Sequence, residues 1–167
     1  MADRTGTYYP ASDDAIHGYG GELQVGDGGS PETFESIAGL RTITFGAMET
    51  ADLDATHLRS PDAHREHRAG IRDSGAFECT GVWLPTEQSQ SNTGGGSGAF
   101  ASGGLIALWR GRQNHNFRVV LAEGSPSNEF EFRGYVQRFQ PGEIGLDNII
   151  EFSAAFQPSQ AFDTGLP

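Results

Sequence analysis

Phenylalanine alternates with charged residues in the C-terminal half of the chain, and this alternation constrains the fold more than any other feature. In the stretch NEFEFRGYVQRFQ (128–140), Phe130 and Phe132 alternate with Glu129 and Glu131. Side chains two positions apart lie on the same face of a strand. The pattern therefore predicts a strand with one buried and one polar face, as antiparallel sheets have.

The same period recurs elsewhere, and short apolar runs separated by glycine and proline favour a mainly β architecture. Gly134 interrupts the first alternation, and we expect it to mark a β-bulge that shifts the phase. The stretch LIALWRGR (105–112) predicts a short helix with Leu105, Leu108 and Trp109 on one face. The final strand, predicted within 147–157, has Ile150, Phe152, Ala154 and Phe156 on one face and Glu151, Ser153 and Ala155 on the other. Further strands are predicted within 21–28, 34–46, 75–84 and 116–122.

Charge and cysteine content exclude several classes of protein. The 167 residues suit a single domain with a real core, and the net charge is −11 with no lysine. Binding to nucleic acid or to an anionic membrane needs concentrated positive charge, which this chain lacks. Cys79, the single cysteine, lies in an apolar run, so we expect a buried and inert thiol. No apolar run has the length of a membrane span, and none near the N-terminus resembles a signal peptide, so we expect synthesis in the cytoplasm without a membrane partner.

The chain divides by composition into a core and several polar segments. Residues 1–21 are expected to form an N-terminal arm, 22–157 a single β domain and 158–167 a C-terminal tail. Within the domain, 47–75 is polar and weakly patterned. Residues 85–104 (PTEQSQSNTGGGSGAFASGG) have the composition of a flexible linker, which is uncommon inside a compact domain.

Three of the five histidines lie in the stretch THLRSPDAHREHRAGIRDSG (56–75). Ser60 as N-cap and Pro61 as first helical residue predict one or two helical turns, which Gly70 would end. Arginines crowd the segment, which disfavours a dication, and the histidine spacing matches no metal motif. A polar segment facing solvent or another subunit is the better interpretation. The histidines of this segment are His57, His64 and His67.

Catalytic motifs are absent from the sequence. The chain has no G-x-S-x-G elbow and no phosphate loop, for which it lacks the lysine. Trp83 and Trp109 suit either a sugar-stacking platform or, more often, anchors of a core or an interface. The sequence therefore predicts no catalytic residue, no metal site and no cofactor.

Several motifs in a fixed order resemble the major tail tube proteins of siphophages and of phage-like gene transfer particles. The stretch GYGGELQVGDGGSPETFESIAG (18–39) is similar to their G-x-G-x-x-L-x-x-G-D start followed by F-x-x-I-A-G. A T-H-x-x-S-P segment with R-E, G-[IL]-x-D and a further G follows within 56–75. Near the C-terminus, G-Y-V (134–136) and a strand after Asp147 match as well. The resemblance covers about residues 18–157, and the Gly/Ser-rich stretch at 88–104 is longer than the family pattern suggests.

This resemblance implies an antiparallel β-sandwich or barrel of the tail-tube type, with one short flanking α-helix and long extended loops. It implies a structural virion protein without enzymatic activity. Hexameric rings would stack head-to-tail into a tail tube, with the tape-measure protein and DNA passing through the lumen and tail-end proteins as further partners. The location would be the virion tail, assembled in the cytoplasm of the bacterial host.

Two groups of residues follow as candidates from the resemblance and from charge. Segment 47–75 is expected to reach another subunit, and an acidic lumen would let DNA slide. A tube of a contractile tail or secretion apparatus, a monomeric ligand-binding β-sandwich and a small metalloenzyme remain alternatives. The inter-subunit candidates are Thr56, His57, Ser60, Pro61, Arg65, Glu66, Gly70, Asp73 and Gly75, and the lumen candidates are Glu129, Glu131 and Glu151.

Overall fold

The computed structural model is mainly antiparallel β with one short α-helix, so the predicted fold class is confirmed. It describes residues 18–58, 64–94, 98–121, 129–160 and 163–164. Within these ranges no helix is long and apolar enough to cross a membrane. The elements are β1 (Glu22–Gly26), β2 (Phe34–Ser36), β3 (Leu40–Thr44), β4 (Glu49–Asp54), β5 (His67–Asp73), β6 (Phe77–Val82), the 3-10 turn η3 (Gly98–Phe100), α1 (Leu105–Gly111), β7 (His115–Val120), β8 (Glu129–Pro141), β9 (Glu151–Pro158) and β10 (Asp163–Thr164).

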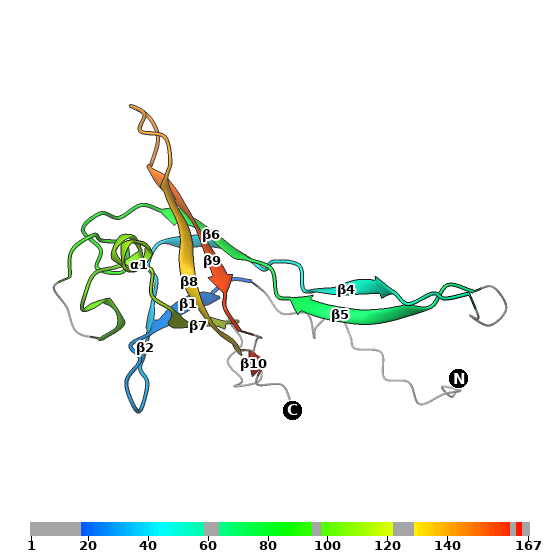
Figure 1. The fold of residues 1–167 in the computed structure, drawn as a ribbon. Helices are drawn as coiled ribbons and strands as arrows, with labels where there is room; N and C mark the ends of the chain where they lie inside the picture. Colours follow the sequence, from blue (N-terminus) through cyan, green and yellow to red (C-terminus); the bar gives the residue numbers. More distant parts are fainter. Residues whose placement is uncertain (1–17, 59–63, 95–97, 122–128, 161–162, 165–167) are drawn as a thin grey trace, which may run out of the picture.

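One large sheet carries the fold, with the strand order β2-β1-β7-β8-β9-β6-β3 and β10 beside β8 (Figure 1). All of its strand pairs are antiparallel. The two edge strands, β2 and β3, are consecutive in the chain and are joined by residues 37–39 alone. The sheet is therefore a barrel that is nearly closed at a short covalent seam.

Stacked phenylalanines fill the concave side of this sheet. The rings of Phe77 and Phe132 lie parallel with centroids 4.3 Å apart, although β9 separates their strands. Phe45, just after β3, contacts the ring of Phe130 on β8 at 5.2 Å. Such contacts across intervening strands require strong curvature of the sheet. Leu105 and Leu108 of α1 enter the same core, as their spacing predicts.

Cys79 also lies in this core, as predicted. Its side chain is buried, and burial raises the pKa of the thiol to about 12. The thiol is therefore neutral and unreactive at physiological pH.

Three local predictions are wrong. The register shift in β8 falls between Val136 and Arg138 and not at Gly134. No helix forms at His67–Ala69, since these residues belong to β5, and Gly70 continues the strand instead of ending a helix. Residues 64–66 of that predicted helix have no regular secondary structure, and residues 61–63 lie outside the described residues.

The loop between β6 and α1 holds the seam together, contrary to its linker-like composition. Gln90 is fully buried, and its side-chain amide donates hydrogen bonds to the carbonyl oxygens of Ala38 (2.6 Å) and Val82 (3.1 Å). Its oxygen accepts a hydrogen bond of 2.7 Å from the N–H of Leu84. The hydroxyl of Ser89 accepts a further one of 3.1 Å from the N–H of Ala38. The two side chains thus satisfy backbone groups that the interrupted sheet leaves without ladder partners.

Gly39 completes the seam through its backbone conformation. Its φ is +74°, in the left-handed region that favours glycine. A Cβ atom here would lie 2.9 Å from the carbonyl oxygen of Val82 and 3.2 Å from Nε2 of Gln90. The I-A-G phrase of the sequence therefore has a physical reason, since Ile37 is buried and Ala38 binds the loop.

We expect Gln90→Ala to destabilise the subunit strongly. It leaves three part-buried backbone groups without their hydrogen-bond partners, at about 1 kcal/mol each, so we expect a loss of roughly 3 kcal/mol in the free energy of unfolding. Urea denaturation of the dissociated subunit measures this loss. The matched control is Gln88→Ala, which removes one hydrogen bond of 3.3 Å to Phe100 and should cost about 1 kcal/mol or less. Equal losses in the two variants would contradict the seam's role.

Candidate functional site

A projecting β-hairpin is the first candidate surface. β4 and β5 form a separate two-stranded sheet that extends away from the main sheet (Figure 1). Every residue of β4 is exposed, and only Gly70 in β5 is partly covered. Ile71 is 87% exposed. An isolated two-stranded hairpin is at best marginally stable in water, so this one lacks a buried face of its own.

Several motif residues of segment 56–75 bind each other within this hairpin. The hydroxyl of Thr56 accepts a hydrogen bond of 3.0 Å from the N–H of Glu66, which joins the two strands beyond β4. At the other end, Oδ1 of Asp73 accepts one of 3.0 Å from the N–H of Gly75, whose φ is +65°. These residues fix the shape and base of the hairpin. The hydroxyl of Thr56 and the carboxylate of Asp73 are thus already hydrogen-bonded within the subunit.

The other candidates of this segment differ in how they are placed. Arg65 is exposed, and Gly70 lies within β5 at a register irregularity between β4 and β5. His57 is exposed near the end of the hairpin. Ser60 and Pro61 lie outside the described residues.

One histidine of the hairpin forms an ion pair with a carboxylate. Nδ1 of His67 lies 2.7 Å from Oδ2 of Asp52, and this exposed pair joins an acidic strand to a more basic one. Among the residues that the structure describes, no three histidine, cysteine or acidic side chains are grouped to hold a metal ion.

A second projection lies at the tip of the β8–β9 hairpin, which rises above the main sheet (Figure 1). Residues 141–149 of this tip are all exposed. Among them Leu146 is fully exposed and Ile144 is 75% exposed. We did not single out this tip from the sequence, although three aliphatic residues in a short stretch bounded by Gly142 were a usable signal.

The convex face of the main sheet brings the three lumen candidates together. Glu131 lies opposite Arg118 across β8 and β7, and residues directly opposite share a face. Glu129 follows by the strand period. Tyr135 lies on this face by the same strand period, and its partner on β9 is Gln157. Glu151 is six residues before Gln157 on β9, so it lies on this face too. The polar residues predicted for two separate strands therefore form one surface.

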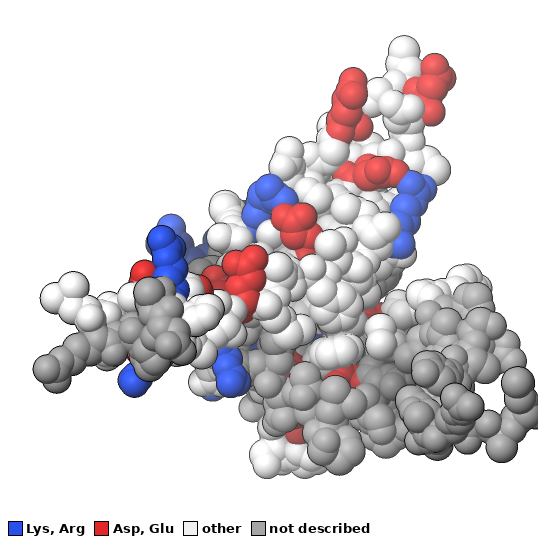
Figure 2. Space-filling view, turned by 90° about the vertical axis from the view of Figure 1, so that its right-hand side faces the viewer, with Lys and Arg blue, Asp and Glu red and all other residues white. Residues whose placement is uncertain are grey.

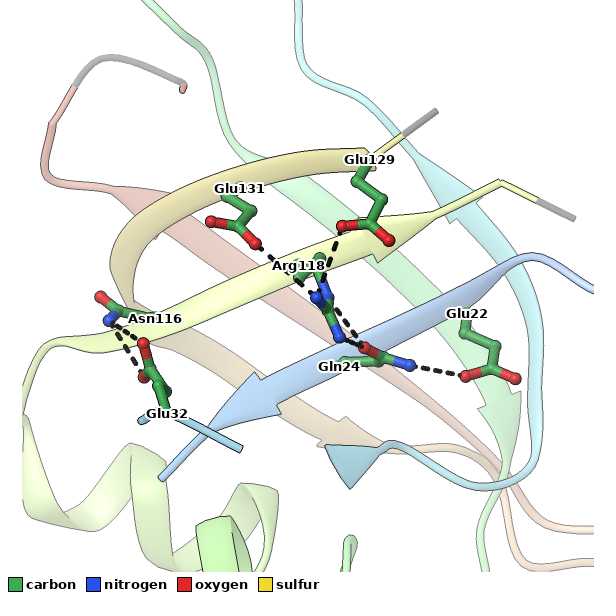
Figure 3. Close-up of polar contacts among 7 residues, drawn as sticks. All are labelled: Glu22, Gln24, Glu32, Asn116, Arg118, Glu129 and Glu131. Carbon is green, nitrogen blue, oxygen red and sulfur yellow. Dashed lines mark hydrogen bonds and ion pairs between the residues drawn. The ribbon is translucent and has the colours of Figure 1, made fainter. Parts of the chain in front are cut away.

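Arg118 is the centre of a polar network on this face (Figure 3). Its guanidinium donates to Oε1 of Gln24 at 2.7 and 3.0 Å, and Nη1 lies 3.4 Å from Oε2 of Glu129 and 3.8 Å from Oε1 of Glu131. The same guanidinium lies 4.1 Å from the centroid of the Phe34 ring. Gln24 in turn donates to Glu22, and Asn116 donates to Glu32. Hydrogen bonds from Ser36 and Gln24 lower the pKa of Glu22.

Two further ion pairs cross the face. Nη2 of Arg138 lies 3.2 Å from Oε1 of Glu78, and the pair spans β9 above Ala155, which explains why Ala155 is buried on a polar face. Arg41 pairs with Glu151. Figure 2 shows acidic and basic side chains interspersed on this side of the molecule, with acidic ones at the projecting tip. Each lumen candidate is therefore accompanied by an arginine that the sequence did not assign.

The two tryptophans form no shared platform. Trp83 follows β6, is partly buried and packs against the core. Trp109 is on α1 and is 48% exposed, whereas Leu105 and Leu108 are buried, so the prediction that the three share one core-facing side of the helix is wrong for Trp109. Trp83 is thus a core residue, and Trp109 belongs to a different surface.

Known structures share this architecture, whereas comparison by sequence finds no matching family model and no matching curated protein. The tail of an empty gene transfer agent (GTA) particle, computed with helical refinement and C6 symmetry, matches with a TM-score of 0.66 at 17% identity, over 90% of this chain and 98% of that one. The SPP1 tail tube matches with a TM-score of 0.59 at 9% identity, over 92% and 81%. The sheath–tube complex of PVC, an extracellular contractile injection system, matches with a TM-score of 0.60 at 8% identity, over 92% and 94%.

These matches extend over nearly the whole chain, so they concern the complete fold and not one motif. The order of motifs in the sequence and the arrangement of strands in space lead independently to the same group of structures. The chain has the fold of siphophage-type tail tube proteins.

Proposed function

We propose that this chain is a structural virion protein that assembles into stacked hexameric rings and forms a phage tail tube through which DNA is delivered. The observation that carries the proposal is the β4–β5 hairpin, whose two faces are both exposed in the subunit. A hairpin of this kind needs a partner surface to be stable. The similarity to a GTA tail with C6 symmetry supports six-fold rings as that partner.

Head-to-tail stacking requires two different surfaces on each copy, which meet in a heterologous contact. We assign the β4–β5 hairpin to such a contact, with Thr56, Glu66, Asp73 and Gly75 maintaining its shape and Arg65 available to a neighbour. The hairpin is held to the main sheet at its base only. It can therefore be a separate projecting arm without weakening the core.

We assign the convex polar face to the lumen. Most of its carboxylates lie beside an arginine, so this face has a weaker negative field than the chain's net charge of −11 suggests. A lumen of this kind neither binds phosphate strongly nor repels it strongly. DNA and the tape-measure protein would pass along it without specific binding.

A tube in a contractile tail or secretion apparatus is the second candidate function. The match to the PVC sheath–tube complex favours it, since its TM-score of 0.60 is close to those of the GTA and SPP1 tails. The two functions differ in whether the outer surface of the tube binds a sheath. Co-assembly with a sheath protein encoded beside this chain distinguishes them.

The purified protein is expected to form rings or tubes. Negative-stain electron microscopy and sedimentation of the purified chain, over a series of salt and protein concentrations, measure this directly. Six-fold rings or hollow tubes are the expected result. A protein that stays monomeric throughout the series would contradict the proposed function.

We expect Arg65→Ala and Asp73→Ala to impair assembly more than folding. Arg65 is exposed, so its replacement should change the free energy of unfolding by less than about 0.5 kcal/mol. Asp73→Ala also removes the hydrogen bond to Gly75 and should cost about 1 kcal/mol. Urea denaturation and sedimentation of each variant separate the two effects. Variants that unfold readily yet polymerise normally would refute the assignment of the arm.

A thiol at position 131 tests the assignment of the lumen. In the Glu131→Cys variant the new thiol is accessible, whereas Cys79 is buried with a pKa of about 12 and gives no background at neutral pH. In assembled tubes we expect reaction with a small maleimide but slow reaction with a long polyethylene-glycol maleimide. Dissociated subunits should react with both reagents. Equal rates for the long reagent in the two states would place this face outside the lumen.

A further inference from the structure

A groove beside the C-terminal end of α1 lies outside every surface assigned above. It has a volume of about 580 Å³ and is formed by the helix end and by the irregular part of β8. Half-exposed Trp109 gives it an apolar wall, and Arg110 and Arg112 lie at its edge. Exposed tryptophan beside arginine is the composition typical of contact hot spots between proteins.

The tip of the β8–β9 hairpin has the complementary composition. Ile144, Leu146 and Ile149 expose aliphatic surface there, and Glu143 and Asp147 lie between them. No element of the described subunit covers these aliphatic side chains. The tip therefore exposes apolar groups in an acidic surrounding.

The charges of the two surfaces are fully segregated along the sequence. Residues 88–122, which include the helix side of the groove, contain arginine and histidine but no aspartate or glutamate. Residues 139–167, which include the tip, contain aspartate and glutamate but no arginine, lysine or histidine. The convex sheet face differs, because its carboxylates already have arginine partners within the subunit. Arg41 lines the same surface hollow as Glu143 and Asp147, but its ion pair is with Glu151. Among the described residues no ion pair involves the two carboxylates of the tip or the two arginines of the groove, so these charges can attract each other between subunits.

The tip does not reach the groove of its own subunit. The groove includes Tyr135, Val136 and Gln137 of β8, and the tip begins only at the end of this same strand. From Arg138 to Pro141 the strand is paired with β9 without interruption, which keeps it extended. An extended ribbon carries the tip away from α1, as Figure 1 shows. The complementary surface must belong to another copy.

We propose that the β8–β9 tip of one subunit binds the groove between α1 and β8 of a second copy of this chain. The aliphatic residues of the tip pack against Trp109, and Glu143 and Asp147 pair with Arg110 and Arg112. The contact joins two different surfaces and therefore propagates from copy to copy. It rests on the proposed self-assembly and adds a second contact that is distinct from the β4–β5 arm.

Cross-linking tests whether tip and groove meet. Asn114→Cys in the groove and Asn148→Cys at the tip introduce exposed thiols next to the proposed contact, and the buried Cys79 thiol stays silent. With a short bismaleimide, the assembled double variant should give a ladder of covalent oligomers on a denaturing gel. The control pairs Asn114→Cys with Thr50→Cys, exposed on β4, and should give no ladder.

Charge reversal tests what holds the contact. Glu143→Arg with Asp147→Arg, or Arg110→Glu with Arg112→Glu, places like charges opposite each other and should lower the sedimenting fraction by about tenfold or more. A chain with all four substitutions has the net charge of the original and again pairs opposite charges. We expect its assembly to return to within about threefold of the original level. Urea denaturation of each variant identifies any loss that comes from unfolding.

The outcomes separate this inference from the proposed function. If the unmodified chain forms tubes while the cross-linked ladder is absent and the reversals have no effect, the contact is refuted and the tube protein stands. If the four-substitution chain assembles no better than either pair alone, the charge pairing is refuted as well. If the unmodified chain never assembles, the proposed function fails and the contact fails with it.

Discussion

The hydrogen bonds of the Gln90 side chain join two parts of the backbone that are distant in sequence, and the closure of the barrel depends on them. They connect Ala38, in the link between β2 and β3, with Val82 at the end of β6 and Leu84 just beyond it. Without them these three part-buried peptide groups would lose their hydrogen-bond partners. Because the barrel is closed here by side chains, its convex face can remain polar throughout without opening the core to water.

Two hairpins project from the barrel and are largely independent of its core. Neither the β4–β5 arm nor the β8–β9 tip buries a face in the subunit, so neither contributes much to folding. Their conformation is instead fixed locally, by the Thr56–Glu66 and Asp73–Gly75 hydrogen bonds in one and by continuous strand pairing in the other. Folding and the proposed assembly would thus use different residues. Substitutions can therefore affect one of them with little effect on the other.

The sequence allowed the fold class to be predicted because apolar and polar residues alternate over much of the barrel strands, and Phe130, Phe132, Phe152 and Phe156 mark the buried face. The seam could not be predicted from the sequence, because no local sequence pattern distinguishes a buried glutamine within a Gly/Ser-rich stretch. The histidine segment was predicted to be helical because Ser60 and Pro61 match the residue preferences of a helix N-terminus, and no strand pattern in β5 opposed this prediction. That strand has no apolar face to produce a period, since both its faces are exposed. The alternation in the sequence correctly placed Glu129 and Glu131 on the polar face of their strand, and Glu151 on the polar face of its own. Their arginine partners lie on other strands, so they could not be identified without the strand order.

The distribution of charge distinguishes the surfaces of this molecule more clearly than the amount of charge. On the convex face arginines lie beside glutamates of the same subunit: Arg118 beside Glu129 and Glu131, Arg138 beside Glu78, and Arg41 beside Glu151. At the tip and at the α1 groove, by contrast, Glu143, Asp147, Arg110 and Arg112 have no ion-pair partner among the described residues. Surface ion pairs contribute only about 0–1 kcal/mol to stability, so their arrangement matters less for folding than for the direction of contact. Compensated charge suits a surface along which a polyanion moves, and separated charge suits a surface at which subunits join.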